Sequence, residues 1–274
     1  METKMIAFVF FLLFSFQAFA FTIPENLTQG MLVYGTAESD EEIFYEDLKV
    51  PVYNGEYVFA LGRNTPETIN ITVKKGWFSK DEHLTFKVKP RKWETDVLNG
   101  VPKRTVNPEK KDTVRIEKEQ KILDNARVQR PVKNGFPKCF LKPVQETRIS
   151  TPFGWQRIYN GVKHRHHSGV DMACPLGTPV KASADGVVVL AENDLFYTGG
   201  TVLIEHGHGI ITGYSHLSEV KAKVGDIVKQ GDIIGLSGST GRSTGPHLHF
   251  TLAWNNIRVA PEFEYCESCP CRDK

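Results

Sequence analysis

The C-terminal half of this 274-residue chain consists of short runs of β-forming residues separated by glycine-containing turns. Beyond residue 136, no stretch shows the longer period of an amphipathic helix. The tetrapeptides GDIV at 225–228 and GDII at 231–234 are near-repeats six residues apart, which indicates successive turns of a tightly wound sheet. These features restrict residues 136–262 to a mainly β fold.

Residues 21–100 are also expected to form β-structure. Runs rich in β-forming residues lie at 50–53, 57–61, 68–73 and 84–88. The turn residues Asn54-Gly55, Gly62 and Lys75-Gly76 separate them. A small β-sandwich is the expected arrangement. This segment carries no cluster of catalytic residue types.

A connector at 101–135 joins the two halves. Residues 100–107 read as a basic linker, and a helix is expected from Pro108 to about Arg130. Pro108 suits the first helical position, where the missing N–H costs nothing. Glu117 and Lys121 form a favourable i, i+4 pair, and Pro131 is expected to end the helix.

The residues that could carry chemistry gather in the C-terminal half. His167 and Asp171 lie in HSGVD, where the central glycine disfavours a helix. His247 and His249 alternate in the apolar run GPHLHFTL, so on a strand both side chains face the same way. His216, in YSHL, lies between the two stretches.

One aspartate and two histidines can ligate a tetrahedral zinc ion and leave its fourth position open to water, as catalytic sites do. The other two histidines are then available for proton transfer. A single histidine in a strand is more often a core or surface residue, so the prediction depends on the combination of HxxxD, a glycine-rich segment and HxH. The alternative zinc motif HExxH is absent, and residues 237–246 lack the lysine of a phosphate-binding loop.

The C-terminal half resembles the lysostaphin-type zinc metallopeptidases, which are cell-wall endopeptidases. The resemblance runs from about residue 149 to residue 250. The motifs that carry it are TPFGWQR at 151–157, HSGVD at 167–171, GTPV at 177–180, ADGVV at 184–188, HGHG at 206–209, YSHL at 214–217, GDIV at 225–228 and GSTGRSTGPHLHF at 238–250. The resemblance implies a mostly antiparallel β-sheet for this domain.

The resemblance also assigns roles to the residues. It implies that His167, Asp171 and His249 hold one zinc ion per chain and that His216 and His247 are the catalytic pair. No other cofactor is implied. Thr251 departs from the glutamate that many members carry after HLHF, at a position that is not a ligand. The remaining nearby histidines are interpreted as cleft or surface residues: His164, His166, His206 and His208.

The implied function is that of an exported zinc metalloendopeptidase, which hydrolyses peptide bonds in the stem peptides or cross-links of peptidoglycan. Two alternatives remain open: a non-enzymatic activator of cell-wall amidases, and a protease of extracellular proteins. The N-terminal segment could bind the wall, shield the active site or support the fold, and a regulatory protein partner is a further candidate.

Residues 1–20 read as a signal peptide for export to the periplasm or cell envelope. Met5 begins an apolar core too short to span a bilayer comfortably, and Ala18-Phe19-Ala20 is an A-x-A cleavage site. Retention as an N-terminal anchor is the alternative. No later segment is expected to cross a membrane.

A net charge of +2 gives no global field that favours nucleic acid.

Five cysteines in an exported chain leave at least one unpaired if every disulfide is internal. Three of them crowd the tail at 263–274, namely Cys266, Cys269 and Cys271. Cys139 and Cys174 could pair with each other or with the tail. Cys174 lies three residues after Asp171, and we interpret it as a core residue rather than a ligand.

Overall fold

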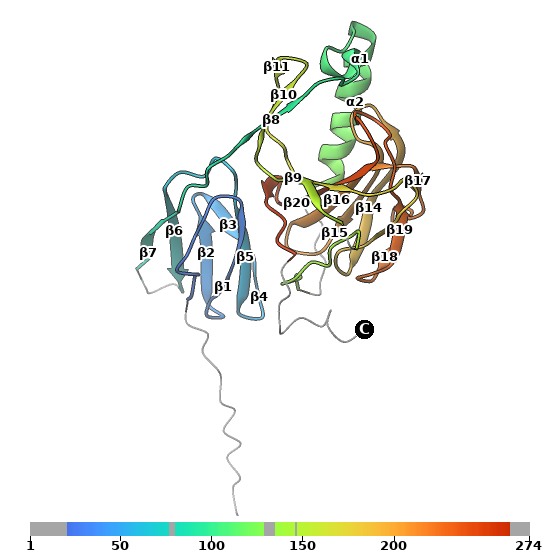
Figure 1. Ribbon diagram of the computed structural model, residues 1–274. Helices are drawn as coiled ribbons and strands as arrows, with labels where there is room; N and C mark the ends of the chain where they lie inside the picture. The colour runs from blue at the N-terminus through green and yellow to red at the C-terminus, as the bar shows by residue number, and fades with distance from the viewer. Residues whose placement is uncertain (1–20, 77–79, 129–134, 146, 264–274) are drawn as a thin grey trace, which may run out of the picture.

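The computed structural model describes residues 21–76, 80–128, 135–145 and 147–263. The predicted signal peptide at 1–20 and the tail cysteines lie outside these residues. The described chain is mostly β-structure, with two layers of N-terminal strands on one side of Figure 1 and a larger C-terminal sheet on the other. The expected fold class is confirmed.

The N-terminal strands form two antiparallel sheets packed face to face. One contains β1 (Met31–Thr36), β5 (Glu56–Leu61) and β4 (Val52–Tyr53). The other contains β3 (Leu48–Val50), β2 (Glu41–Tyr45), β6 (Thr68–Lys75) and β7 (Glu82–Lys87). Along β6, Ile69, Ile71 and Val73 are buried in alternation with more exposed residues. Tyr45 and Phe59 join the sheets, with ring centroids 4.7 Å apart, so this segment is a β-sandwich.

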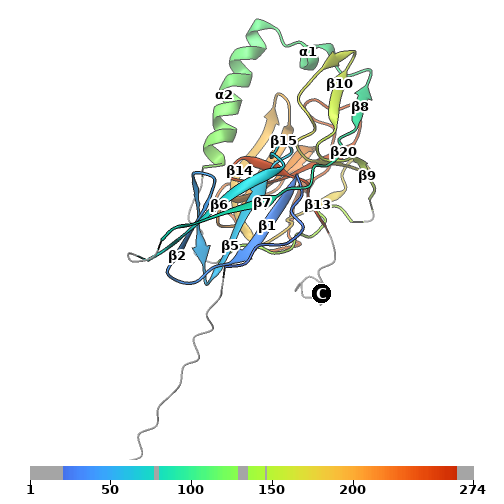
Figure 2. The same cartoon turned by 90° about the vertical axis from the view of Figure 1, so that its left-hand side faces the viewer.

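The connector differs from the expected linker and helix. Strand β8 (Thr95–Leu98) precedes it, and the connector contains the short helix α1 (Lys103–Val106) and helix α2 (Lys110–Ala126). Helix α2 begins two residues after Pro108, because Glu109 caps it and exchanges side-chain hydrogen bonds with the backbone around Asp112 in a capping box. It ends at Ala126, four residues earlier than predicted. Figure 2 shows α1 at the top, between α2 and β10 (Gln156–Tyr159).

The C-terminal half centres on an eight-stranded sheet in which the strand pairings are antiparallel. Its strands are, in spatial order, β18 (Ile227–Val228), β14 (Gly186–Leu195), β15 (Gly199–Glu205), β16 (Ile210–Leu217), β20 (His247–Trp254), β12 (Val170–Ala173) and β9 (Ile149–Thr151), with β21 (Ile257–Val259) also beside β20.

Two small sheets flank this central one. The first contains β13 (Pro179–Lys181), β19 (Ile233–Leu236) and β17 (Glu219–Val220). The near-repeats at 225–228 and 231–234 therefore enter two different sheets, through β18 and β19. The second contains β11 (Val162–Lys163), β10 and β8, and β8 runs parallel to β10.

The two faces of the central sheet have different partners. On β20, Leu248, Phe250, Leu252 and Trp254 enter a hydrophobic core that continues into the sandwich. Trp254 meets Phe59 there, with ring centroids 6.5 Å apart. Helix α2 packs on the opposite face, where Ala126 lies among residues that include Leu203 and Ile211. The histidines of β20 belong to this second face, because they alternate with the core residues.

Candidate metal and catalytic site

Two neighbouring strands bring the predicted ligands together. Asp171 on β12 lies directly opposite His249 on β20 in the antiparallel register. His167 precedes β12, and the intervening Gly169 lets the backbone pass close to β20. A Cβ atom at Gly169 would lie 2.1 Å from the carbonyl oxygen of Phe250. The glycine of HxGxD therefore allows the backbone at Gly169 to lie close to the backbone of β20.

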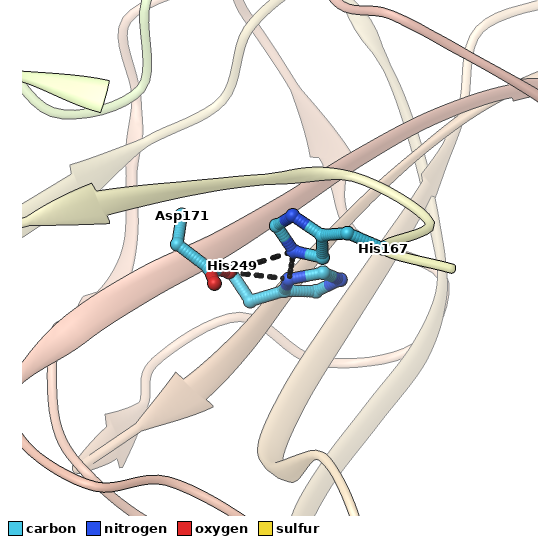
Figure 3. A group of neighbouring side chains, drawn as sticks. All are labelled: His167, Asp171 and His249. Carbon is cyan, nitrogen blue, oxygen red and sulfur yellow. Dashed lines mark hydrogen bonds and ion pairs between the residues drawn. The ribbon is translucent and has the colours of Figure 1, made fainter. Parts of the chain in front are cut away.

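The three side chains point at one another (Figure 3). His249 Nδ1 lies 2.7 Å from Asp171 Oδ1 and 2.9 Å from His167 Nε2, and His167 Nε2 lies 3.0 Å from Asp171 Oδ1. All three residues are buried. Three ligand atoms thus converge on one small region of the sheet face.

The protonation of these groups suits a metal cation. His167 donates its Nδ1 proton to the carbonyl of Pro152 at 2.8 Å, which leaves Nε2 as a lone-pair donor. Burial lowers the pKa of His249 to about 4, so its imidazole is neutral near pH 7. Burial tends to raise the pKa of Asp171, but His167 and His249 hold that pKa well below its usual range. Two imidazole nitrogens and one carboxylate oxygen are a donor set that fits zinc.

The two other predicted histidines lie beside this cluster. The ring centroids of His216 and His247 are 4.7 Å apart, and His247 Nε2 lies 3.7 Å from Asp171 Oδ1. His216 donates Nδ1–H to the carbonyl of Thr240 at 2.7 Å, and His247 donates Nδ1–H to that of Gly245 at 2.8 Å. In both rings Nε2 is therefore the atom free to accept a proton.

Burial, together with the neighbouring His247 and His249, lowers the pKa of His216 to about 3. Its imidazole is neutral at any pH near 7. His216 also adopts a φ of 66°, a conformation that few residues other than glycine adopt and that is often found at functional sites.

The structure adds contacts that the sequence did not reveal. Arg157, on β10, forms an ion pair with the outer oxygen of Asp171. It lies within the TPFGWQR motif, but no spacing rule links it to Asp171. Thr251 follows His249 on the same face and accepts a hydrogen bond from Arg258 at 3.0 Å.

One of the other histidines was wrongly placed by the sequence. His206 is not a cleft or surface residue but is buried, with Nδ1 donating to the carbonyl of Asp185 and Nε2 bonded to Thr212, both at 2.7 Å. His164, His166 and His208 lie outside the group of possible metal ligands found among the described residues.

Cys139 and Cys174, the two cysteines among the described residues, are in different states. Cys139 is disulfide-bonded, whereas Cys174 is free and buried, so these two do not pair with each other. Cys174 belongs to the hydrophobic core, as predicted.

Comparison with known proteins finds similarity to peptidases. Residues 165–261 match the profile of Peptidase family M23. The peptidoglycan DD-endopeptidase ShyA of Vibrio cholerae is 49% identical over 106 residues, which cover 38% of this chain and 24% of that protein. The chain thus matches about a quarter of the length of this curated relative.

Two solved structures extend the comparison. A crystal structure from Pseudomonas aeruginosa assigned to peptidase M23 is 29% identical, covers 85% of this chain and 92% of that one, and superposes with a TM-score of 0.65. The catalytic domain of lysostaphin from Staphylococcus simulans is 38% identical over 42% of this chain and 89% of that domain, with a TM-score of 0.38. Residues 165–261 therefore place the chain in peptidase family M23, the lysostaphin-type zinc metallopeptidases.

Proposed function

We propose that this chain is an exported zinc metalloendopeptidase that hydrolyses peptide bonds in peptidoglycan stem peptides or cross-links. The observation that carries the proposal is the convergence of His167 Nε2, Asp171 Oδ1 and His249 Nδ1 within 3.0 Å of one another. The substrate class is supported by the name of the Vibrio relative, a peptidoglycan DD-endopeptidase.

His167, Asp171 and His249 would hold one zinc ion per chain. When bound, zinc polarises a carbonyl oxygen and lowers the pKa of a water molecule towards neutrality. The protein contributes the arrangement of the donors: the carbonyl of Pro152 fixes the tautomer of His167, and the β12–β20 pairing places Asp171 against His249.

His216 and His247 would carry the protons. In the neutral form of each ring Nε2 is the proton acceptor, since the Nδ1 proton is held by a backbone carbonyl. One can accept a proton from the attacking water, and the protonated ring can return it to the leaving amine. HExxH enzymes use a glutamate next to a ligand in sequence as the base. This chain has no such glutamate beside His167, Asp171 or His249, so the two histidines take that role.

The first alternative, a non-enzymatic activator of amidases, would not need the metal-binding and proton-transfer groups that this chain retains together. The second alternative, a protease of extracellular proteins, would use the same site on another substrate. A regulatory partner remains a proposal that rests on the sequence.

Export to the periplasm or cell envelope rests on the sequence of residues 1–20. Among the described residues, no helix has the length and apolar character needed to cross a membrane. The sequence favours no nucleic acid partner.

Zymography separates these functions. Purified protein is tested on gels that contain sacculi and, in parallel, on gels that contain casein, each with and without a zinc chelator. Chelator-sensitive clearing of the sacculi alone supports the proposal. Clearing of casein supports the second alternative, and no clearing by a zinc-loaded chain supports the first.

A further inference from the structure

The carboxylate of Asp171 is held from both sides. Its inner oxygen, Oδ1, faces His167 and His249, while its outer oxygen, Oδ2, is paired with the guanidinium of Arg157. The side chain of Arg157 is 15% exposed, so water screens this ion pair little. No sequence rule assigns Arg157 a role.

Arg157 itself is held in place by its surroundings. Its guanidinium carbon lies 5.6 Å from the ring centroid of Tyr159, two residues along the same strand. Strand β10 lies between β11 and β8, and Arg157 is the register partner of Asp96 on β8. Tyr159 packs against Leu98 of β8 and against Val106 of α1. Strand β8 and the connector therefore support the strand that carries the arginine.

We propose that Arg157 is a positioning residue that restricts Asp171 to ligation through one oxygen. The inference rests on the proposed metal site. With Oδ2 paired to a guanidinium, only Oδ1 is presented to a cation, and the carboxylate plane cannot rotate to offer both oxygens. The open coordination position of a catalytic zinc site is then kept for water instead of a second carboxylate oxygen.

The identity of the residue matters to this argument. A guanidinium is planar and permanently charged, and here its Nη2 group donates to Oδ2. Lysine can supply the charge to Oδ2 but not the fixed orientation. A neutral side chain of similar length supplies neither.

The test compares Arg157→Met and Arg157→Lys with the native chain. Lys163→Met is the matched control, because Lys163 is an exposed cation on the neighbouring strand β11. Zinc affinity is measured by competition with a chromophoric chelator. The visible spectrum of the Co²⁺-loaded protein reports the coordination number, and thermal unfolding of the metal-free protein reports the fold.

Arg157→Met is expected to bind zinc roughly 10- to 100-fold more weakly, the range found for groups that orient metal ligands. Its Co²⁺ absorption should weaken as a second carboxylate oxygen enters. Arg157→Lys should lie between this variant and the native chain, and Lys163→Met should match the native chain.

Native affinity and an unchanged Co²⁺ spectrum in Arg157→Met would overturn the inference and leave the proposed function standing. If the metal-free Arg157→Met chain does not fold, Arg157→Lys decides in the same way. A folded native chain that binds no zinc would overturn the proposed function together with this inference.

Discussion

His216 and His247 face each other with ring centroids 4.7 Å apart, and both donate their Nδ1 protons to carbonyls of one loop, at Thr240 and Gly245. A single stretch of backbone therefore sets the tautomer of both rings. Because carbonyl groups can be supplied by any residue type, substitutions of the loop side chains are expected to leave these tautomers intact as long as the loop keeps its path.

The metal prediction concerns His249. The native chain should purify with about one zinc ion, and His249→Ala should lose both zinc and hydrolytic activity, because a tetrahedral site with two protein ligands binds weakly. Metal content is measured by atomic emission. His83→Ala, on β7 of the sandwich, is the control and should keep its zinc. Stoichiometric zinc in His249→Ala would rule out the ligand assignment.

The proposed catalytic pair should behave differently from the proposed ligands. His216→Ala and His247→Ala are expected to keep most of their zinc and to lose cleavage by at least about a hundredfold, the usual scale for general acid–base groups. Rates on purified sacculi and zinc content are measured on the same samples. Near-native cleavage by both variants would refute their role.

Gly169→Ala should damage the site through the backbone. The added Cβ would lie 2.1 Å from the carbonyl of Phe250, so β12 and β20 must separate. A loss of about 1–3 kcal/mol of unfolding free energy is expected, together with weaker zinc binding. Gly245→Ala is the matched control, since a Cβ there meets no atom within 4 Å. Equal denaturation midpoints for the two variants would contradict this prediction.

The buried His206 should make stability depend on pH. Burial lowers its pKa in the folded chain to about 4, whereas the unfolded chain titrates near 6.5. Below pH 6.5 the unfolded state therefore binds a proton that the folded state does not. The free energy of unfolding consequently falls as the pH is lowered from 6.5 towards 4.

Urea unfolding of the metal-free chain measures this effect. When the pH is lowered from 7 to 5, the free energy of unfolding of the native chain should fall by about 2 kcal/mol more than that of His206→Gln. The glutamine amide can still form hydrogen bonds at this position, but it does not titrate. His83→Gln is the control and should follow the native chain. Parallel pH profiles for the native chain and His206→Gln would show that His206 does not set this dependence.

The role of the connector can be tested in the full chain. Val106 of α1 lies in one hydrophobic cluster with Tyr159. Arg242 donates to the carbonyl of Thr105 at 3.4 Å, from the loop whose carbonyls bond both proposed catalytic histidines. If this contact restricts access to the site, Val106→Asp should cleave soluble muropeptides severalfold faster, whereas Lys103→Asp, an exposed change on α1, should not.

The same variants on intact sacculi distinguish the alternatives. Slower cleavage of sacculi by Val106→Asp, with unchanged rates on soluble muropeptides, would indicate a docking role. Unchanged rates on both substrates would leave the connector with a supporting role only.

The sequence predicted the parts of the molecule that depend on local periodicity. The alternation in HLHF placed both histidines of β20 on one face. The glycine of HSGVD indicated that the backbone between His167 and Asp171 is not helical. The sandwich followed from its spaced turns. The roles of the site residues and the domain boundaries at 21–100, 101–135 and 136–262 stay predictions.

The missed features depend on contacts between distant segments. The parallel pairing of β8 with β10 joins residues about sixty positions apart, and no local pattern encodes it. The carbonyl partners of His167 and His216 could not be predicted from the sequence, because every residue has a backbone carbonyl group. The start of α2 was misplaced because the carboxylates of Glu109 and Asp112 cap backbone N–H groups, which decides the boundary over the proline preference.

The contact between Phe59 and Trp254 has a consequence for how the chain can be processed. Since both halves contribute to one core, a single cut in the connector would yield two fragments that stay associated as a nicked complex, because separation would expose large apolar surfaces on each. Proteolytic trimming is therefore a poor way to liberate the C-terminal half, and a recombinant version of that half alone is expected to aggregate.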